Sequence, residues 1–191
     1  MNTTYIALLR GINVGGHTVK MDRLRSLFEE LGFARVRSYI QTGNVFFESG
    51  ETDQRVLRTS IEDHLRSALG FAVPTCVRTV EEVERVLGLD PFQGLTVTPE
   101  IRLAVTFLSE PATVTLPVPY LTPDGAFELI GMTPTELFVV WRLQDGRPGN
   151  SYGLIEKHVS VPGTTRFWHT TAKILAAARA GLEGSQARGL N

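Results

Sequence analysis

Cysteine and long apolar runs are scarce in this chain. Its single cysteine, Cys76, cannot form an intramolecular disulfide, and it lies in the strand-like run 74–77, where we expect it to be a small core residue. No apolar stretch approaches the roughly 20 residues needed to span a bilayer. No basic segment precedes the first apolar run either, as a targeting signal would require. We therefore expect a cytoplasmic protein without membrane contact.

Net charge is also low, at −1 over 191 residues. Residues 1–78 carry 10 Lys and Arg against 8 Asp and Glu, residues 79–135 carry 2 against 8, and residues 136–191 carry 7 against 4. Two mildly basic ends therefore flank an acidic middle, and an anionic partner should meet the ends. The excess is too small to predict nucleic-acid binding by itself.

Several catalytic patterns are missing. No two histidines stand at metal-ligand spacing, and one cysteine cannot complete a zinc site, so we expect no metal. The G-x-S-x-G pattern is absent, and no Ser, His and Asp arrangement can be recognised. Serine hydrolases and zinc enzymes are therefore excluded, and we expect no cofactor. The sequence shows no paired nucleophile and base, so it assigns no reaction.

Hydrophobic periodicity predicts an α+β fold. In the first 78 residues the expected order is strand, helix, strand, strand, helix, strand, typical of a ferredoxin-like βαββαβ sheet with two helices on one face. The expected ranges are 5–9, 21–31, 34–40, 44–48, 53–69 and 73–78. In the first strand Tyr5, Ala7 and Leu9 alternate with Ile6 and Leu8. Because both faces are apolar, something from the second half should cover the open face.

The remainder predicts a second, smaller α+β half, packed on the first as one compact unit. Helices are expected at 79–87, 151–159 and 166–180, strands at 101–108, 126–130 and 136–143, and an irregular proline-rich stretch at 111–123. We expect subdomains of residues 1–78 and 79–181, followed by a frayed tail over 182–191.

The loop after the first strand reads R-G-I-N-V-G-G over residues 10–16. Its spacing approaches the phosphate-binding G-x-x-x-x-G-K-[ST], but the lysine is missing and a hairpin follows, so a P-loop NTPase is excluded. A weaker hypothesis is that the loop binds a phosphate or carboxylate near a helix N-terminus. Its candidate ligands are Arg10, Gly11, Asn13, Gly15, Gly16, His17 and Lys20. The alternative is a loop that only connects strand to helix.

A second candidate lies near the C-terminus. If Thr164 or Thr165 caps a helix, Arg166, His169 and Lys173 fall on one basic stripe together with Thr170. An ordinary amphipathic surface helix would look the same and is the better interpretation when this segment is taken alone. Only convergence with the glycine loop would make the stripe a site.

Single-stranded nucleic-acid binding is a third interpretation, because RNA-recognition modules share the predicted order of elements. Phe46 and Phe47 loosely match their aromatic motif. Adjacent strand residues point to opposite faces, however, so both rings cannot stack bases. Nucleic acid is therefore a minority interpretation.

The stretch Y-I-A-L-L-R-G-I-N-V-G-G over residues 5–16, the hairpin 39–47 and the segment 164–166 together resemble a group of bacterial proteins classed only as a domain of unknown function. The resemblance spans nearly the whole chain and implies a ferredoxin-like α+β fold, with no established activity. Members often have asparagines where this chain has Phe167 and His169, and usually a lysine in the segment matching 146–151. A family ligand would therefore bind differently here, or not at all.

The leading hypothesis from the sequence is that the glycine loop binds a small anion, a nucleotide or phosphorylated metabolite, helped by the 166–173 stripe. A protein-interaction or structural module without a small ligand is the second hypothesis. Single-stranded nucleic-acid binding is the third.

Overall fold

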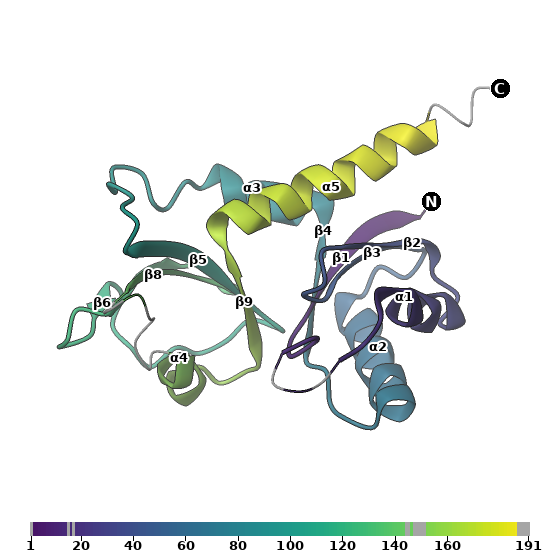
Figure 1. The fold of residues 1–191 in the computed structure, drawn as a ribbon, viewed down its shortest axis with the longest axis horizontal. Coiled ribbons are helices and arrows are strands. Elements are labelled where there is room, and N and C mark those ends of the chain that lie inside the picture. The colour runs from purple at the N-terminus through teal and green to yellow at the C-terminus, as the bar shows by residue number, and fades with distance from the viewer. Residues whose placement is uncertain (1, 15, 17, 144–145, 147–151, 187–191) are drawn as a thin grey trace. The chain divides into compact units, whose positions relative to one another are not determined.

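Two antiparallel sheets, one of four strands and one of five, organise the chain in a computed structural model (Figure 1). The structure describes residues 2–14, 16, 18–143, 146 and 152–186. The chain divides into one unit of residues 1–87 with 172–191 and a second unit of residues 88–171. The expected α+β class is confirmed. The expected boundary after residue 78 stays a prediction.

The first unit follows the expected strand and helix order. Its elements are β1 (Thr3–Leu9), α1 (Met21–Glu30), β2 (Ala34–Tyr39), β3 (Asn44–Ser49), α2 (Gln54–Leu69), β4 (Thr75–Thr79) and most of α3 (Val80–Gly88). The sheet order is β2-β3-β1-β4, with every pair antiparallel. This is the arrangement expected of a split βαβ fold, in which the first strand lies inside the sheet.

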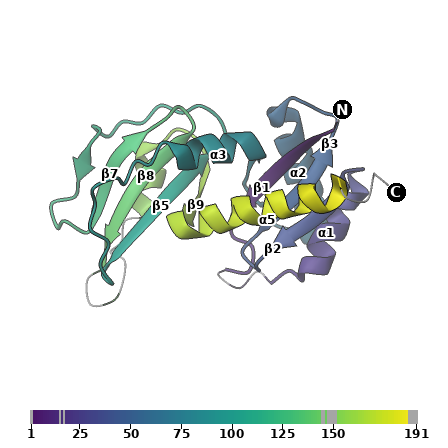
Figure 2. The ribbon, with the colours of Figure 1, turned by 90° about the horizontal axis from the view of Figure 1, so that it is seen from above.

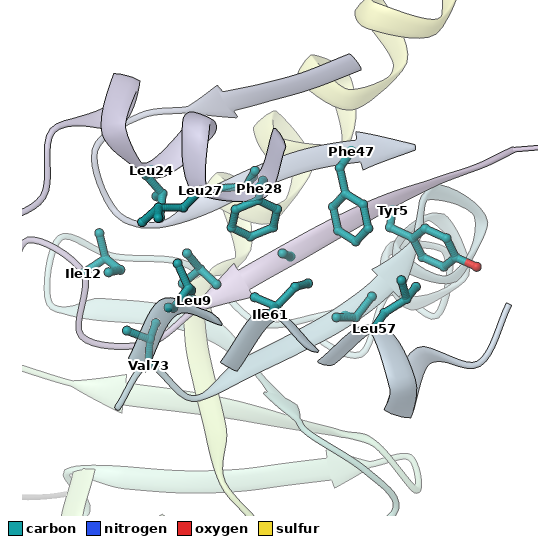
Figure 3. Close-up of a cluster of buried hydrophobic side chains, with 14 of the residues drawn as sticks. Tyr5, Leu9, Ile12, Leu24, Leu27, Phe28, Phe47, Leu57, Ile61 and Val73 are labelled. Atoms are coloured by element: carbon teal, nitrogen blue, oxygen red, sulfur yellow. The ribbon is translucent and has the colours of Figure 1, made fainter. Parts of the chain in front are cut away.

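One face of this sheet is covered by α1 and α2. Residues of the two helices interleave with alternate residues of β1 and β3, and Figure 3 shows Phe28, Phe47 and Ile61 meeting in this core. Phe47 stacks on Phe33 with ring centroids 4.3 Å apart. The period-2 pattern of the strands and the 3.6-residue pattern of the helices therefore meet on the same buried layer.

The opposite face of the sheet is also buried. Ile6 and Leu8 point away from α1 and α2 and are 0% and 1% exposed. The helix α5 (Trp168–Gln186) lies on this side of the sheet, opposite α1 and α2 (Figures 1 and 2). A helix from the end of the chain thus belongs to the first unit from Ala172 onward, as the two apolar faces of β1 required.

A half-buried arginine attaches α5 to the sheet. The guanidinium of Arg37 lies over the Phe46 ring, 5.1 Å from its centroid, and donates to the carbonyl oxygens of Ala177 and Ala178 at 3.1 and 3.2 Å. Burial lowers the pKa of Arg37 from its ordinary value. Gly181, expected to end the helix, instead lies inside it beside Arg37, and α5 continues to Gln186.

The second unit is built on the order β6-β7-β8-β5-β9. Its elements are β5 (Ile101–Leu108), β6 (Tyr120–Leu121), β7 (Phe127–Met132), β8 (Glu136–Arg142), α4 (Tyr152–His158), β9 (Gly163–Phe167) and the first turn of α5. One sheet face packs on Ile155 of α4. Three aromatic residues of this unit form a separate cluster, in which Trp168 packs edge-on against Phe92 and Phe138 at centroid distances of 5.0 and 6.3 Å.

The expected helix over residues 166–180 is wrong at its start. Residues 163–167 form β9, in which Arg166 lies opposite Val105 of β5, and the helix begins at Trp168. Thr164 and Thr165 are therefore strand residues and no helix cap. Their β-branched side chains suit a strand, and pairing with a distant partner strand outweighed the local helical spacing.

Candidate functional site

The glycine loop, residues 10–20, leaves the end of β1 and is anchored at both sides. The N–H of Leu9 donates to the Gly43 carbonyl oxygen at 2.8 Å. The N–H of Arg10 donates to the Pro74 carbonyl oxygen at 2.9 Å. Ile12 is buried in the core of the first unit. The start of the loop is therefore held by the turn between β2 and β3 and by the residue before β4.

Two described glycines of this loop adopt the left-handed conformation, with φ of 77° at Gly11 and 96° at Gly16. A Cβ added at either position would meet no atom within 4 Å. Glycine is thus required here by backbone conformation and not by close packing. Gly15 and His17, both candidate ligands, lie outside the described residues.

Asn13 closes the loop with its side chain. Its Oδ1 accepts from the N–H of Val19 at 2.7 Å, and its Nδ2 donates to the carbonyl oxygens of Val19 and Gln41 at 3.2 and 2.8 Å. Its φ of 57° is one that asparagine tolerates well. Because both the oxygen and the nitrogen of its side-chain amide are engaged within the protein, Asn13 shapes the loop.

The bond from Asn13 to Gln41 joins the glycine loop to the turn of the β2–β3 hairpin. Gly43 is needed in this turn, since its φ is 73° and a Cβ there would lie 2.9 Å from the Cβ of Leu9. The buried Asn44 side chain donates to the carbonyl oxygen of Tyr39 at 3.2 Å and to Thr42 Oγ1 at 3.1 Å. Sequence reasoning found the turn residues and missed their contact with the glycine loop.

The loop ends at the N-terminus of α1, which has no side-chain cap. Lys20 occupies the N-cap position, is exposed and makes no capping hydrogen bond. In α2, by contrast, Asp53 Oδ1 accepts from the N–H groups of Arg55 and Val56. An acidic residue, Asp22, lies in the first turn of α1 but pairs with Arg25. The side chain of the cap residue therefore satisfies none of the first-turn N–H groups of α1.

The three C-terminal candidates occupy different surroundings. Arg166 is buried in the second unit, where Nη1 donates to Thr164 Oγ1 at 2.8 Å and to the Thr165 carbonyl oxygen at 3.0 Å. His169 is exposed and stacks on Phe167 at a centroid distance of 5.9 Å. Lys173 is exposed one turn further along α5. Arg166 and His169 belong to the second unit and Lys173 to the first, so their convergence with the glycine loop stays a prediction.

Other kinds of site find little support in the described residues. No group of three or more His, Cys, Asp or Glu in that part of the chain could hold a metal ion. Phe46 and Phe47 are both buried, so neither ring is presented for stacking on a base. None of the described helices combines the length and apolar character that a bilayer crossing requires.

A solved structure has a similar fold. The conserved bacterial protein SP0830 from Streptococcus pneumoniae has a similar structure, with a TM-score of 0.67 and 23% sequence identity over 92% of this chain and 98% of that chain. A search of curated proteins finds no match. The model of the family described as protein of unknown function, DUF1697, matches residues 1–120. The chain therefore belongs to this family.

Proposed function

We propose that the glycine loop and the N-terminus of α1 bind a small anionic ligand, a nucleotide or a phosphorylated metabolite. The observation that carries the proposal is the uncapped N-terminus of α1 with the exposed Lys20 at its N-cap position. The first-turn N–H groups of a helix and its macrodipole attract negative charge. A lysine there repels the positive helix end unless an anion lies between them.

The surrounding loop supports this assignment. Asn13 bonds to Val19 and Gln41 and so holds the described part of the loop without a ligand. Gly11 and Gly16 adopt conformations in which backbone N–H groups can turn toward a ligand. Arg10, at the start of the loop, supplies a second cation. A ligand then binds with a smaller entropic penalty for ordering the described part of the loop.

Thermal shift with a panel of nucleotides and phosphometabolites tests the proposal. Wild type should be stabilised by at least one compound, and an Arg10→Ala, Lys20→Ala variant should lose most of that shift. An Arg55→Ala, Arg66→Ala variant is the matched control, because it removes two exposed charges from α2 in the same unit. If no compound stabilises wild type more than the loop variant, the proposal fails.

The candidates on β9 and α5 are tested in the same assay. If Arg166, His169 and Lys173 contribute, the Lys173→Ala and His169→Ala variants should each weaken the response to the ligand that the loop binds. Unchanged responses would limit the site to the glycine loop and α1.

The two alternative functions have separate tests. A stable oligomer or partner seen by size-exclusion scattering and pull-down without ligand would favour an interaction module. Binding of a single-stranded oligonucleotide that weakens steeply as salt rises would favour nucleic-acid binding, because phosphate neutralisation releases counterions.

A further inference from the structure

The turn between β6 and β7 contains an Asp-Gly pair, Asp124–Gly125. An aspartate before a glycine is chemically vulnerable, because glycine has no side chain to shield its backbone nitrogen from the preceding carboxyl group. Asp124 is exposed, and Gly125 has a φ of 68°. The chain has a second Asp-Gly pair at residues 145–146, of which Asp145 lies outside the described residues.

The modification open to such a pair is isoaspartate formation, which needs only water as a co-reactant. The backbone nitrogen of Gly125 forms a bond to Cγ of Asp124, and the carboxyl hydroxyl leaves with the N–H proton as water. The product is a five-membered succinimide ring. Water then opens the ring. Cleavage between the nitrogen and Cγ restores aspartate, whereas cleavage between the nitrogen and the backbone carbonyl carbon gives isoaspartate, whose backbone runs through Cγ.

The turn opposes both requirements of the first step. The N–H of Gly125 donates to the Thr122 carbonyl oxygen at 2.8 Å, which retains the proton that must leave. Asp124 Oδ1 accepts from Thr122 Oγ1 at 2.6 Å and from the N–H of Ala126 at 3.0 Å. These two bonds lower the pKa of Asp124 below its ordinary value, because they stabilise the ionised form. A carboxylate has no hydroxyl that can leave as water.

Thr122 also joins the two ends of the turn. Its N–H donates to the Phe127 carbonyl oxygen at 2.9 Å, and its Oγ1 accepts from the N–H of Phe127 at 3.0 Å. The same hydroxyl that bonds to Asp124 therefore helps to close the hairpin. Removal of this hydroxyl should free the carboxyl group and loosen the turn together.

Isoaspartate would change the sheet beside the turn. β6 has two residues and lies at the edge of the five-stranded sheet (Figure 1), where Tyr120 pairs with Leu129 and Leu121 with Glu128. The modification adds one carbon to the backbone between β6 and β7. The isoaspartate form should therefore lose the register that pairs these two strands.

We propose that Asp124–Gly125 is an isoaspartate-forming site whose modification is suppressed in the folded protein by the hydroxyl of Thr122. Isoaspartate accumulates at this pair when the β6–β7 turn opens, because opening releases both the carboxyl group and the Gly125 N–H. Turns of this kind open locally at a lower free energy than the whole domain. The site lies in the second unit and is independent of the glycine loop.

The test is to incubate the full chain at neutral pH, folded or in urea, and to measure isoaspartate by peptide mass spectrometry with electron-transfer fragmentation. In urea, wild type should form isoaspartate at both Asp-Gly pairs. In the folded protein, Asp124 should be modified more slowly than in urea. Thr122→Val should raise the folded-state rate at Asp124 about fivefold, the factor that corresponds to one hydrogen bond. Thr122→Ser keeps the hydroxyl and should remain close to wild type.

Asp145 is the internal control, since neither substitution at Thr122 should change its rate of modification. The inference is overturned if folded wild type is modified at Asp124 as fast as the protein in urea, or if Thr122→Val is no faster than wild type. Equal rates for Thr122→Ser and Thr122→Val would overturn the role of the hydroxyl. A rise at both Asp124 and Asp145 in Thr122→Val would assign the effect to general unfolding and also overturn the inference.

Discussion

The guanidinium of Arg37 occupies the space that a side chain on Gly181 would need. A Cβ built on Gly181 would fall well inside van der Waals contact with Arg37. The same guanidinium bonds to the carbonyl oxygens of Ala177 and Ala178, one turn before Gly181. Because Gly181 has no side chain, the guanidinium of Arg37 fits beside α5 and bonds the sheet to this helix.

Gly181→Ala should lower the free energy of unfolding by about 1 kcal/mol net, because the flexible end of Arg37 must move and give up its hydrogen bonds to α5. The better helix propensity of alanine offsets about 1 kcal/mol of the gross effect. Urea denaturation measures the difference. Gly153→Ala is the control, since Gly153 lies in α4 with nothing within 4 Å of an added Cβ, and it should be neutral or slightly stabilising.

A double-mutant cycle separates this clash from a general effect on α5. In an Arg37→Ala background the space beside Gly181 is empty, so Gly181→Ala should no longer destabilise the protein. Strictly additive effects of the two substitutions would contradict the proposed role of Gly181.

Asn13→Gly should destabilise the first unit by about 1–3 kcal/mol, because three side-chain hydrogen bonds are lost. Glycine keeps the positive φ of this position, so the experiment isolates the side chain from the backbone. Chemical denaturation without ligand is the measurement. Asn13→Asp retains the acceptor for Val19 N–H and should cost less. Unchanged stability of Asn13→Gly would mean that the loop is not held by this amide.

Lys20→Ser should raise the free energy of unfolding by about 0.5–1 kcal/mol in the absence of ligand. A serine hydroxyl accepts from the first-turn N–H groups of α1 and removes a cation from the positive helix end. The reciprocal control is Asp53→Ala, which removes the existing cap of α2 and should lower stability by about 1 kcal/mol. A destabilised Lys20→Ser variant would instead indicate that the fold itself needs the lysine.

The ion pair between Glu84 of α3 and Arg179 of α5 predicts a pH-dependent contribution to stability. The hydrogen bond from Arg179 and the positive charge of that residue lower the pKa of Glu84 below its ordinary value. Since the folded-state pKa is the lower one, the pair stabilises the protein above the unfolded-state pKa, and this contribution is lost as pH falls through the folded-state pKa.

Glu84→Gln should therefore destabilise the protein slightly at pH 7 and have no effect once the carboxyl is protonated. The measurement is the unfolding free energy of both proteins across an acid titration, repeated at high salt, which should shrink the difference. Glu81→Gln, exposed on the same helix, is the control. An effect of Glu84→Gln that persists at acid pH would assign it to something other than the ion pair.

Local sequence patterns predict most elements of this fold within a few residues. The strand expected over 101–108 has the same bounds as β5, and the helix expected over 21–31 is α1, whose Leu24, Leu27 and Phe28 are buried. Alternation in β1 predicted two covered faces. These features depend on residues that are close in sequence, where side-chain periodicity is set by backbone geometry alone.

The candidate site was harder to predict because its decisive contacts are distant in sequence. The sequence makes Asn13 a candidate ligand, but the acceptor that reveals its structural role, the Gln41 carbonyl oxygen, lies 28 residues away. Ile40 fits the strand expected over 34–40, but its left-handed φ places it in the turn after β2. A turn conformation of this kind follows from the packing on both sides of it and is not encoded by residue type.

The sequence by itself determined the α+β class, the order of elements in the first unit and the position of the glycine loop, since each follows from short-range periodicity and turn chemistry. Only the tertiary structure decided that Arg166 lies in a strand and that Gly181 continues a helix. Pairing of β9 with β5 overrode a helical spacing, and the guanidinium of Arg37, from 144 residues earlier in the numbering, gave Gly181 its role. Such choices depend on long-range hydrogen bonds and packing. Their free energies exceed the local helix propensities, which differ by only about 0–0.7 kcal/mol per residue.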